Sequence, residues 1–352
     1  MGLDAFAAIL YVLFFCGGAL LTMRRPAYGV ALLILIQPFA LYGDVWHTNL
    51  TLPKATLLGV LLGLIPFTGA LRVLSSRAPR AILIAGALLL VTTILTFAHA
   101  TYTVPVTRET LKLVEYLLLF TAVVTAYRLD PDIKLIRAAC IVVAAAVALI
   151  ALSQEFVAAP SFLRINDHLM PRVAGPIEGP NQLAGYFDVA LPLVLAFCIT
   201  TPAPAAQFVL FLIVLADVLT FSRGGALGAT LGTLVVALTF RKNIARPLSF
   251  MAAGLLLGIG VAGIRSHSLG FFRLWNFSDT SYAGGVGSRS KLWHAASTLW
   301  ERHPIFGIGA GNFELEIPLA GVRGIRTHAN SLYLQQLVEG GIPSILATLW
   351  LT

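Results

Sequence analysis

The chain has 352 residues, of which 58% are hydrophobic and 11% are charged, and it carries a formal net charge of +8. Soluble domains contain about 25% charged residues, so this composition excludes a soluble globular protein. The apolar runs are long and continuous, which also excludes a transmembrane β-barrel made of alternating segments of about ten residues. No basic stretch is dense enough for nucleic acid, and the positive charge suits anionic membrane lipids and phosphate-bearing lipid substrates. The sequence therefore predicts an all-α fold, a polytopic helical bundle integral to a membrane.

The apolar runs predict about eleven membrane spans, because a hydrocarbon core about 30 Å thick requires roughly 20 apolar residues per helix. The first run has no basic region before it and no small-residue cleavage site, so it is predicted to be a span and not a signal peptide. The predicted spans cover residues 4–22, 27–42, 54–72, 81–99, 111–127, 135–157, 183–200, 205–221, 225–240, 247–265 and 331–350.

Lysine and arginine residues lie in alternate loops, and this pattern orients the chain because cytoplasmic loops are enriched in them. The opposite, periplasmic side then receives a short loop at 158–182, the turn "FSRGG" at 221–225 and a long segment at 266–330. We predict a single integral membrane domain over residues 1–352. The last predicted span reaches Thr352 with no tail after it, so we expect the chain to be truncated. The basic residues that define the predicted cytoplasmic loops are Arg24, Arg25, Arg72, Arg77, Arg80, Arg128, Lys134, Arg137, Arg241, Lys242 and Arg246.

The long periplasmic segment contains a predicted amphipathic helix from Ser288 to Arg302, which would lie on the membrane or on the helical bundle. Pro304 would end this helix, and "HPIFGIGAGNF" (303–313) supplies three glycines for a tight loop. In the earlier loop, "RVAGPIEGPNQLAGY" (172–186) places Asn181 at a predicted helix N-cap. The apolar face of the amphipathic helix is predicted to contain Leu292, Trp293, Ala296, Leu299 and Trp300.

Four motifs, "SRGG", "GSRSKLW", "HPIFGIGAGNF" and "THANSLYLQQLVEGG", occur in this order and resemble the bacterial O-antigen ligase superfamily. "GPNQLAGY" resembles an earlier loop of that family, so the resemblance spans roughly residues 165–350. It implies that a periplasmic histidine ahead of a membrane helix and two arginines are catalytic. Matched position by position, these residues are His328, Arg223 and Arg289. Arg172 and Asn181 match the earlier loop as substrate-binding residues.

The resemblance implies a glycosyltransferase of the bacterial inner membrane, acting in lipopolysaccharide biosynthesis with its active site on the periplasmic face. Its donor would be a glycan on undecaprenyl diphosphate, and its acceptor a sugar hydroxyl of the lipid A–core oligosaccharide. Arginine suits the leaving diphosphate because its guanidinium forms bidentate, charge-assisted hydrogen bonds. His328 suits a general base near neutral pH, and a helix N-terminus beside substrate-binding Arg326 would keep its imidazole neutral.

The outer loops contain no Asp-x-Asp pair and no metal-ligand spacing, so we expect neither a metal nor another cofactor. We also expect no carboxylate cluster near His328 that would hold a cation. The outer loops lack a second, closely set carboxylate nucleophile, which favours direct displacement with inversion over a double displacement. Each residue has a simpler interpretation: His328 as an interfacial histidine, Arg223 as a snorkelling arginine, and Arg289 as a solvated side chain on the amphipathic helix.

Three other functions stay open. An O-antigen polymerase would use the same donor twice, and polymerases can show an Arg-x10-Gly pattern in two loops. Arg164 with Gly175 and Arg273 with Gly284 fit this pattern, but one such match is expected by chance. A protein O-oligosaccharyltransferase would use the donor on a protein. A transporter or flippase would need charges paired deep in the spans, whereas the motif arginines are predicted at the outer face.

Overall fold

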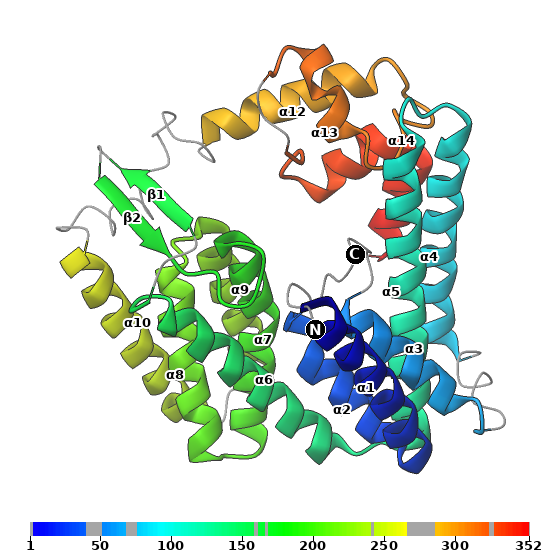
Figure 1. Cartoon of the computed structure of the whole chain (residues 1–352). Helices are drawn as coiled ribbons and strands as arrows, with labels where there is room; N and C mark the ends of the chain where they lie inside the picture. Colours follow the sequence, from blue (N-terminus) through cyan, green and yellow to red (C-terminus); the bar gives the residue numbers. More distant parts are fainter. Residues whose placement is uncertain are drawn as a thin grey trace. The chain divides into compact units, whose positions relative to one another are not determined.

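The computed structural model describes residues 3–39, 51–67, 76–157, 161–165, 168–240, 243–265, 286–323 and 327–351. The chain forms two compact units, which we treat separately (Figure 1). Unit 1 combines residues 1–66 with 129–277, and unit 2 combines residues 67–128 with 278–352. The predicted single domain stays a prediction.

Unit 1 contains eight α-helices among its described residues, together with one β-hairpin. The strands β1 (Ser161–Ile165) and β2 (His168–Arg172) pair antiparallel, with Ser161 opposite Arg172. The sequence analysis did not predict this hairpin in the short outer loop. The helices are α1 (Leu3–Arg24), α2 (Pro26–Ile36), α3 (Leu52–Leu64), α6 (Ile133–Ser153), α7 (Pro180–Thr200), α8 (Pro204–Leu219), α9 (Arg223–Thr239) and α10 (Ala245–Arg265).

Unit 2 contains two long helices early in its sequence and a group of helices near the C-terminus. Figure 1 shows α4 and α5 side by side, and α14 packs on α4. The helices are α4 (Arg77–Leu95), the short 3-10 helix η3 (Thr96–Ala98), α5 (Thr103–Leu129), α12 (Val286–Trp300), α13 (Phe313–Glu316), the 3-10 helix η4 (Ile317–Ala320) and α14 (Leu332–Leu351).

Every apolar run predicted to span the membrane contains one of these helices, so the prediction of a helical membrane protein is confirmed. Among the described residues, six helices are long and apolar enough to cross a bilayer: Ala7–Arg24, Arg77–Ala98, Thr103–Leu129, Ile133–Ser153, Pro180–Thr200 and Ala245–Ile264. Four further apolar helices have 10–17 residues, at Pro26–Phe39, Leu52–Leu64, Pro204–Leu219 and Arg223–Thr239. The count of about eleven spans therefore stays a prediction.

The core of unit 1 lies between α6, α7 and α8, where Phe187, Leu191, Leu195, Leu210 and Ile213 are almost fully buried. Helices α1 and α3 pack closely because small residues face one another at their interface. A methyl group added at Gly59 would overlap the backbone carbonyl of Phe15 on the neighbouring helix.

One end of unit 1 is fixed by a polar cluster that joins two loops. Arg25, after α1, donates to both carboxylate oxygens of Asp130, at 3.0 and 2.9 Å, and to Asp132 at 3.1 Å. The hydrogen bonds from the Arg25 guanidinium hold the pKa of the Asp130 carboxyl below its usual range. The sequence analysis assigned both loops to the same side of the membrane, and this contact places them at the same end of the unit.

The outer loop 158–182 reaches the other end of α6. There the Gln154 amide bonds Ala174 and Gly175, and the Val173 amide donates to the Leu219 carbonyl at 3.3 Å. This loop and the turn between α8 and α9 therefore meet at one end of unit 1, as their predicted placement on the same side of the membrane requires.

In unit 2 the predicted amphipathic helix exists as α12, and it packs on α14 and η4. Its buried face consists of Leu292, Ala295, Ala296 and Leu299. The predicted face was wrong at Trp293, which is 42% exposed. The two adjacent alanines allow a close approach of the helices that an indole ring would prevent. Trp300 is half-buried, and its Nε1 donates to the Pro304 carbonyl at 3.0 Å, after the end of the helix.

Candidate functional site

Helix α14 is interrupted near its middle, and the motif "HPIFGIGAGNF" supplies hydrogen-bond partners for the backbone groups that the interruption leaves unpaired. Gly341 has non-helical dihedral angles, with φ 67° and ψ −160°, and Pro343 follows it. Backbone groups freed by such a break must be satisfied elsewhere, because they are costly to bury unpaired. The carbonyl of Val338 accepts from the amide of Ile308 at 2.9 Å, and the carbonyl of Glu339 accepts from the amide of Gly309 at 3.0 Å.

The glycines of the motif are required by this close contact. Gly307 has φ +70°, and a Cβ placed there would lie 2.5 Å from the carbonyl carbon of Glu339. A Cβ at Gly341 would overlap the carbonyl of Ile305, whose oxygen accepts from the amide of Ile342 at 3.1 Å. The expectation of a tight, close-approach loop is confirmed, and the surface that it approaches is the broken part of α14.

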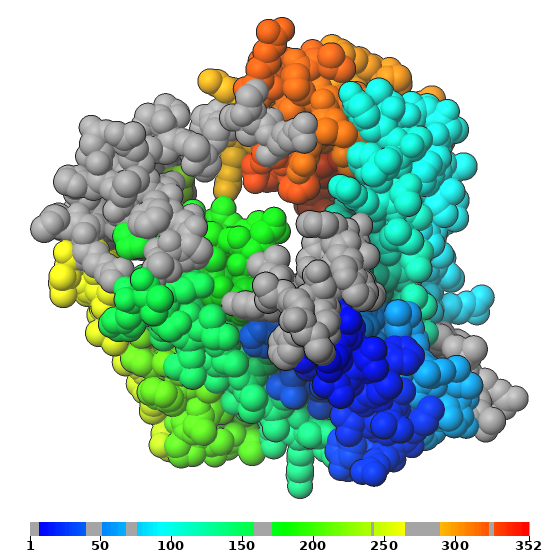
Figure 2. Space-filling model, in the orientation of Figure 1, coloured from blue at the N-terminus to red at the C-terminus, as the bar shows by residue number. Residues whose placement is uncertain are grey.

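The other side of the motif docks on the connection between α4 and α5. Asn312 is fully buried, accepts from the Tyr102 amide at 3.0 Å and donates to the Tyr102 carbonyl at 3.0 Å. His99 Nε2 lies 3.0 Å from the Gly307 carbonyl. Figure 2 shows the orange surface of this region directly against the cyan surface of α4 and α5. The motif therefore joins the two sequence segments of unit 2.

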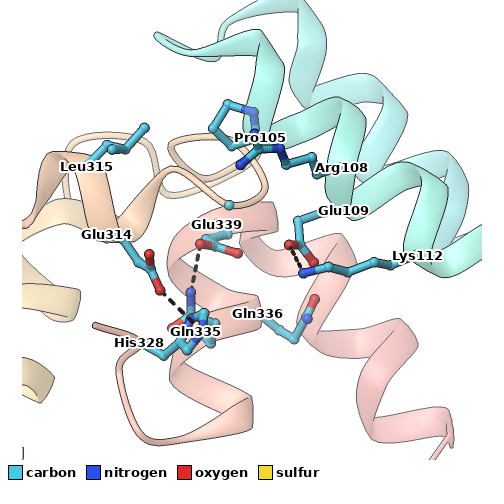
Figure 3. A pocket seen from close by; sticks show the side chains of 11 residues that line it. Pro105, Arg108, Glu109, Lys112, Glu314, Leu315, His328, Gln335, Gln336 and Glu339 are labelled. Carbon is cyan, nitrogen blue, oxygen red and sulfur yellow. Dashed lines mark hydrogen bonds and ion pairs between the residues drawn. The ribbon is translucent and has the colours of Figure 1, made fainter. Parts of the chain in front are cut away.

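A pocket of about 410 Å³ opens beside this junction (Figure 3). One wall belongs to α5, the opposite wall to α13 and to the residues before α14, and the floor to α14 itself. The lining is mostly polar and contains both carboxyl and amide side chains. The lining residues are Pro105, Arg108, Glu109, Lys112, Gly311, Glu314, Leu315, His328, Gln335, Gln336 and Glu339.

His328 lies just before α14, as the sequence analysis predicted. The polar cap of this helix is Ser331, whose Oγ accepts from the Leu334 amide at 3.4 Å. Between them, Asn330 adopts a left-handed conformation with φ 53°, and Ala329 is fully buried. The buried Ala329 anchors the backbone, whereas the His328 side chain is 73% exposed toward the pocket and solvent.

The nearest ionisable partner of His328 is a carboxylate. Glu314 Oε1, on α13, lies 3.2 Å from His328 Nε2, and Glu109 and Glu339 line the same pocket (Figure 3). The sequence did not predict this carboxylate partner of His328. Glu314 is 14 positions away and on another element, so only the tertiary fold brings the two side chains together.

All three carboxyl groups have contacts within unit 2. Glu314 contacts the imidazole, and Glu109 accepts from Lys112 Nζ at 2.6 Å. Glu339 is buried and accepts from the Phe313 amide at 3.2 Å and from Gln335 Nε2 at 2.7 Å. In the described part of the chain, no group of three or more His, Cys, Asp or Glu side chains is arranged to hold a metal ion.

Two other predicted residues do not line this pocket. Arg289 is exposed on the first turns of α12, on the solvent side of the helix. Arg326 lies outside the described residues. Of the five predicted site residues that the structure describes, only His328 lines the pocket.

The remaining three predicted residues gather at one end of unit 1. Arg172 Nε donates to the Thr220 carbonyl at 2.6 Å, and its Nη2 donates to Asn181 Oδ1 at 2.9 Å. Arg223, half-buried, is the first residue of α9, and Ser222 caps that helix by accepting from the Gly225 amide at 3.2 Å.

The predicted role of Asn181 as a helix cap was wrong. The N-cap of α7 is Gly179, and Pro180 occupies the first helical position, which its fixed φ favours. The Asn181 side chain is thereby free to bond Arg172, on the strand before it. Asn181, Arg172 and the turn before Arg223 thus form one polar surface, rich in cations, beside the N-termini of α7 and α9.

A comparison with known protein families covers much of both sites. Residues 208–349 match the family model described as O-antigen ligase. The resemblance to the O-antigen ligase superfamily is confirmed. The matched segment contains Arg223, Arg289 and His328, and also Glu314, whereas Arg172 and Asn181 precede it. No curated protein and no solved structure matches the chain.

Proposed function

We propose that the protein transfers a glycan from undecaprenyl diphosphate to a sugar hydroxyl of lipid A–core, as an O-antigen ligase of the bacterial inner membrane. One observation carries the proposal: His328, which lies within the residues that match the O-antigen ligase family, lines an open polar pocket. The proposal retains the predicted topology of about eleven spans, which places the active site on the periplasmic face.

In this proposal His328 removes the proton of the acceptor hydroxyl. A general base must reach the proton that it takes, and the exposed imidazole at the pocket mouth is accessible to a large glycan acceptor. The carboxylate and amide groups of the lining suit a sugar, because carboxylates accept hydrogen bonds from hydroxyl groups and side-chain amides both accept and donate them. Direct displacement with inversion is favoured, since each carboxyl group of the pocket already contacts a neighbouring side chain or amide.

We assign the leaving diphosphate to the cationic surface of unit 1. Arg223 begins a helix, where the backbone amides and the positive end of the dipole favour an anion. Arg172 and Asn181 are held together beside it and supply further donors. Arg289 and Arg326 keep their predicted roles toward the diphosphate and the substrate. No metal is required in this proposal, because the arginines stabilise the developing charge.

The donor assignment is tested by substituting Arg223. Loss of one preorganised donor weakens transition-state stabilisation by about 2–4 kcal/mol, so Arg223→Ala is expected to lower transfer accordingly. Arg223→Lys should restore only part of it, because an ammonium cannot form the bidentate contact. Arg246→Ala, an exposed arginine at the start of α10, is the matched control. Normal transfer by Arg223→Ala at normal expression would leave Arg223 as a snorkelling residue.

The acceptor distinguishes the candidate functions within the family. Purified protein in detergent is incubated with undecaprenyl-diphosphate-linked glycan and offered lipid A–core, donor alone, or a pilin-like protein. We expect glycan only on lipid A–core. Lengthening of the donor glycan would identify a polymerase, and glycosylated protein would identify an O-oligosaccharyltransferase. No transfer to any acceptor, with glycan movement only across sealed vesicles, would indicate a transporter.

A further inference from the structure

The contact between His328 and Glu314 specifies which imidazole nitrogen is available for chemistry. We propose that Glu314 is a positioning residue that holds His328 through Nε2 and leaves Nδ1 to act as the base. This inference rests on the proposed function, in which His328 deprotonates the acceptor. The inference goes beyond the proposed function by adding Glu314 to the site and by assigning the proton transfer to one nitrogen of His328.

The argument begins with hydrogen-bonding capacity. An ionised carboxylate can only accept, so at 3.2 Å from Glu314 Oε1 the Nε2 atom of a neutral His328 must carry the hydrogen. The other nitrogen, Nδ1, then has a free lone pair. When the acceptor approaches, its O–H bond breaks, the proton moves to Nδ1, and the oxygen forms a bond to the anomeric carbon. The bond from that carbon to the diphosphate oxygen breaks, and the diphosphate leaves with the electron pair.

The carboxylate also acts after the proton has moved. An imidazolium forms at His328, and an adjacent negative charge favours that charged state. This is the role of the acidic member of a Ser-His-Asp triad, which orients the ring and stabilises the imidazolium without itself taking the proton. Because the pair is partly exposed to solvent, with the Glu314 side chain 35% accessible, its effect is expected to be smaller than in a buried triad.

Two side chains of α14, Gln335 and Glu339, hydrogen-bond the backbone next to both His328 and Glu314. Gln335 Oε1 accepts from the amide of Ala329, next to His328, at 2.7 Å. Gln335 Nε2 donates to Glu339 Oε1 at 2.7 Å, and the same oxygen accepts from the amide of Phe313, next to Glu314, at 3.2 Å. One chain of hydrogen bonds on one helix therefore fixes the backbone beside both residues, so the distance between them is set by α14.

Among the described residues that line the pocket, the other charged groups belong to α5 and α14. Arg108, Glu109 and Lys112 line the opposite wall of the pocket, where Lys112 is already paired with Glu109, and Glu339 lies in the floor. Glu314 is the group in direct contact with the imidazole. Removing its carboxylate should therefore leave the imidazole ring without its orienting partner.

The test is a double-mutant cycle with purified full-length protein, undecaprenyl-diphosphate-linked glycan and lipid A–core. Glu314→Gln is expected to lower kcat on the order of 10–100-fold, the range for losing a partner that orients a functional histidine. Its KM values should change little. Glu314→Asp should recover part of the activity. The variant with both Glu314→Gln and His328→Ala should be no slower than His328→Ala alone, because the carboxylate acts through the imidazole.

Glu301→Gln, at an exposed glutamate after α12, is the matched control and should behave as the unsubstituted protein. Two results would overturn the inference: an unchanged kcat for Glu314→Gln, or losses that multiply in the doubly substituted variant. If His328→Ala itself kept full turnover, the proposed base would be wrong, which is a separate failure. Melting temperatures of all variants identify a loss that arises from unfolding.

Discussion

The contact between Gly307 and the broken part of α14 gives a prediction whose magnitude follows from the geometry. Gly307→Ala introduces a Cβ at φ +70°, a conformation that costs an L-residue about 1–2 kcal/mol. The same Cβ would lie 2.5 Å from the Glu339 carbonyl carbon and 2.6 Å from the Val338 oxygen. Overpacking of this kind typically costs about 1–3 kcal/mol more. We therefore expect a total destabilisation of about 2–5 kcal/mol.

Gly321→Ala is the matched control, because Gly321 has φ +86° and a Cβ added there would meet no other heavy atom within 4 Å. It should show the conformational cost alone, about 1–2 kcal/mol. The assay is thermal unfolding of the purified protein in detergent, with glycan transfer measured on the same samples. A clearly larger loss for Gly307→Ala is expected. Equal losses for the two variants would refute the argument that the close approach to α14 is what requires glycine at position 307.

Three further predictions concern the base, the topology and an ion pair. His328→Ala should lower turnover by about 10²–10⁴-fold, and His328→Gln should be almost as slow. EDTA should leave transfer unchanged. Loss of transfer in EDTA that Mg²⁺ restores would instead show that the reaction requires a metal ion. A cysteine replacing Glu178, in a chain without native cysteines, should react with an impermeant maleimide in spheroplasts, and one replacing Lys134 should react only after lysis; the reverse would invert the topology. Asp130→Asn should lower thermal stability at pH 7, because the hydrogen bonds from Arg25 depress the pKa of Asp130 in the folded protein. The resulting stabilisation is present above the unfolded pKa of about 3.9 and is lost as the pH falls through the lower folded value. The melting temperatures of Asp130→Asn and of the unsubstituted protein should therefore converge in acid.

Sequence patterns predicted the features that depend on local physics. The apolar runs became helices, and Ser331 caps α14 because a hydroxyl before an apolar run satisfies a helix amide. The hairpin also had a local signal, the dipeptide Asn166-Asp167 between two short runs, but it was not interpreted as a turn.

The features that the sequence did not reveal depend on contacts between distant residues. Glu314 contacts His328 only because Gln335 and Glu339 fix the backbone beside both of them, and no spacing rule contains that information. The orientation of α12 likewise depends on its neighbouring helix. Hydrophobicity alone predicts that Trp293 is buried, but Ala295 is the residue buried against α14, because a small side chain permits close packing.

The interruption of α14 has a consequence for the order in which unit 2 folds. Before residues 305–309 pack against this helix, the carbonyls of Val338 and Glu339 and the amide of Ile342 lack partners within it. Buried backbone groups without a hydrogen bond cost free energy, so the helix is unstable until those residues reach it. The half-helix beside His328 can therefore settle only after the loop at 305–309 has docked.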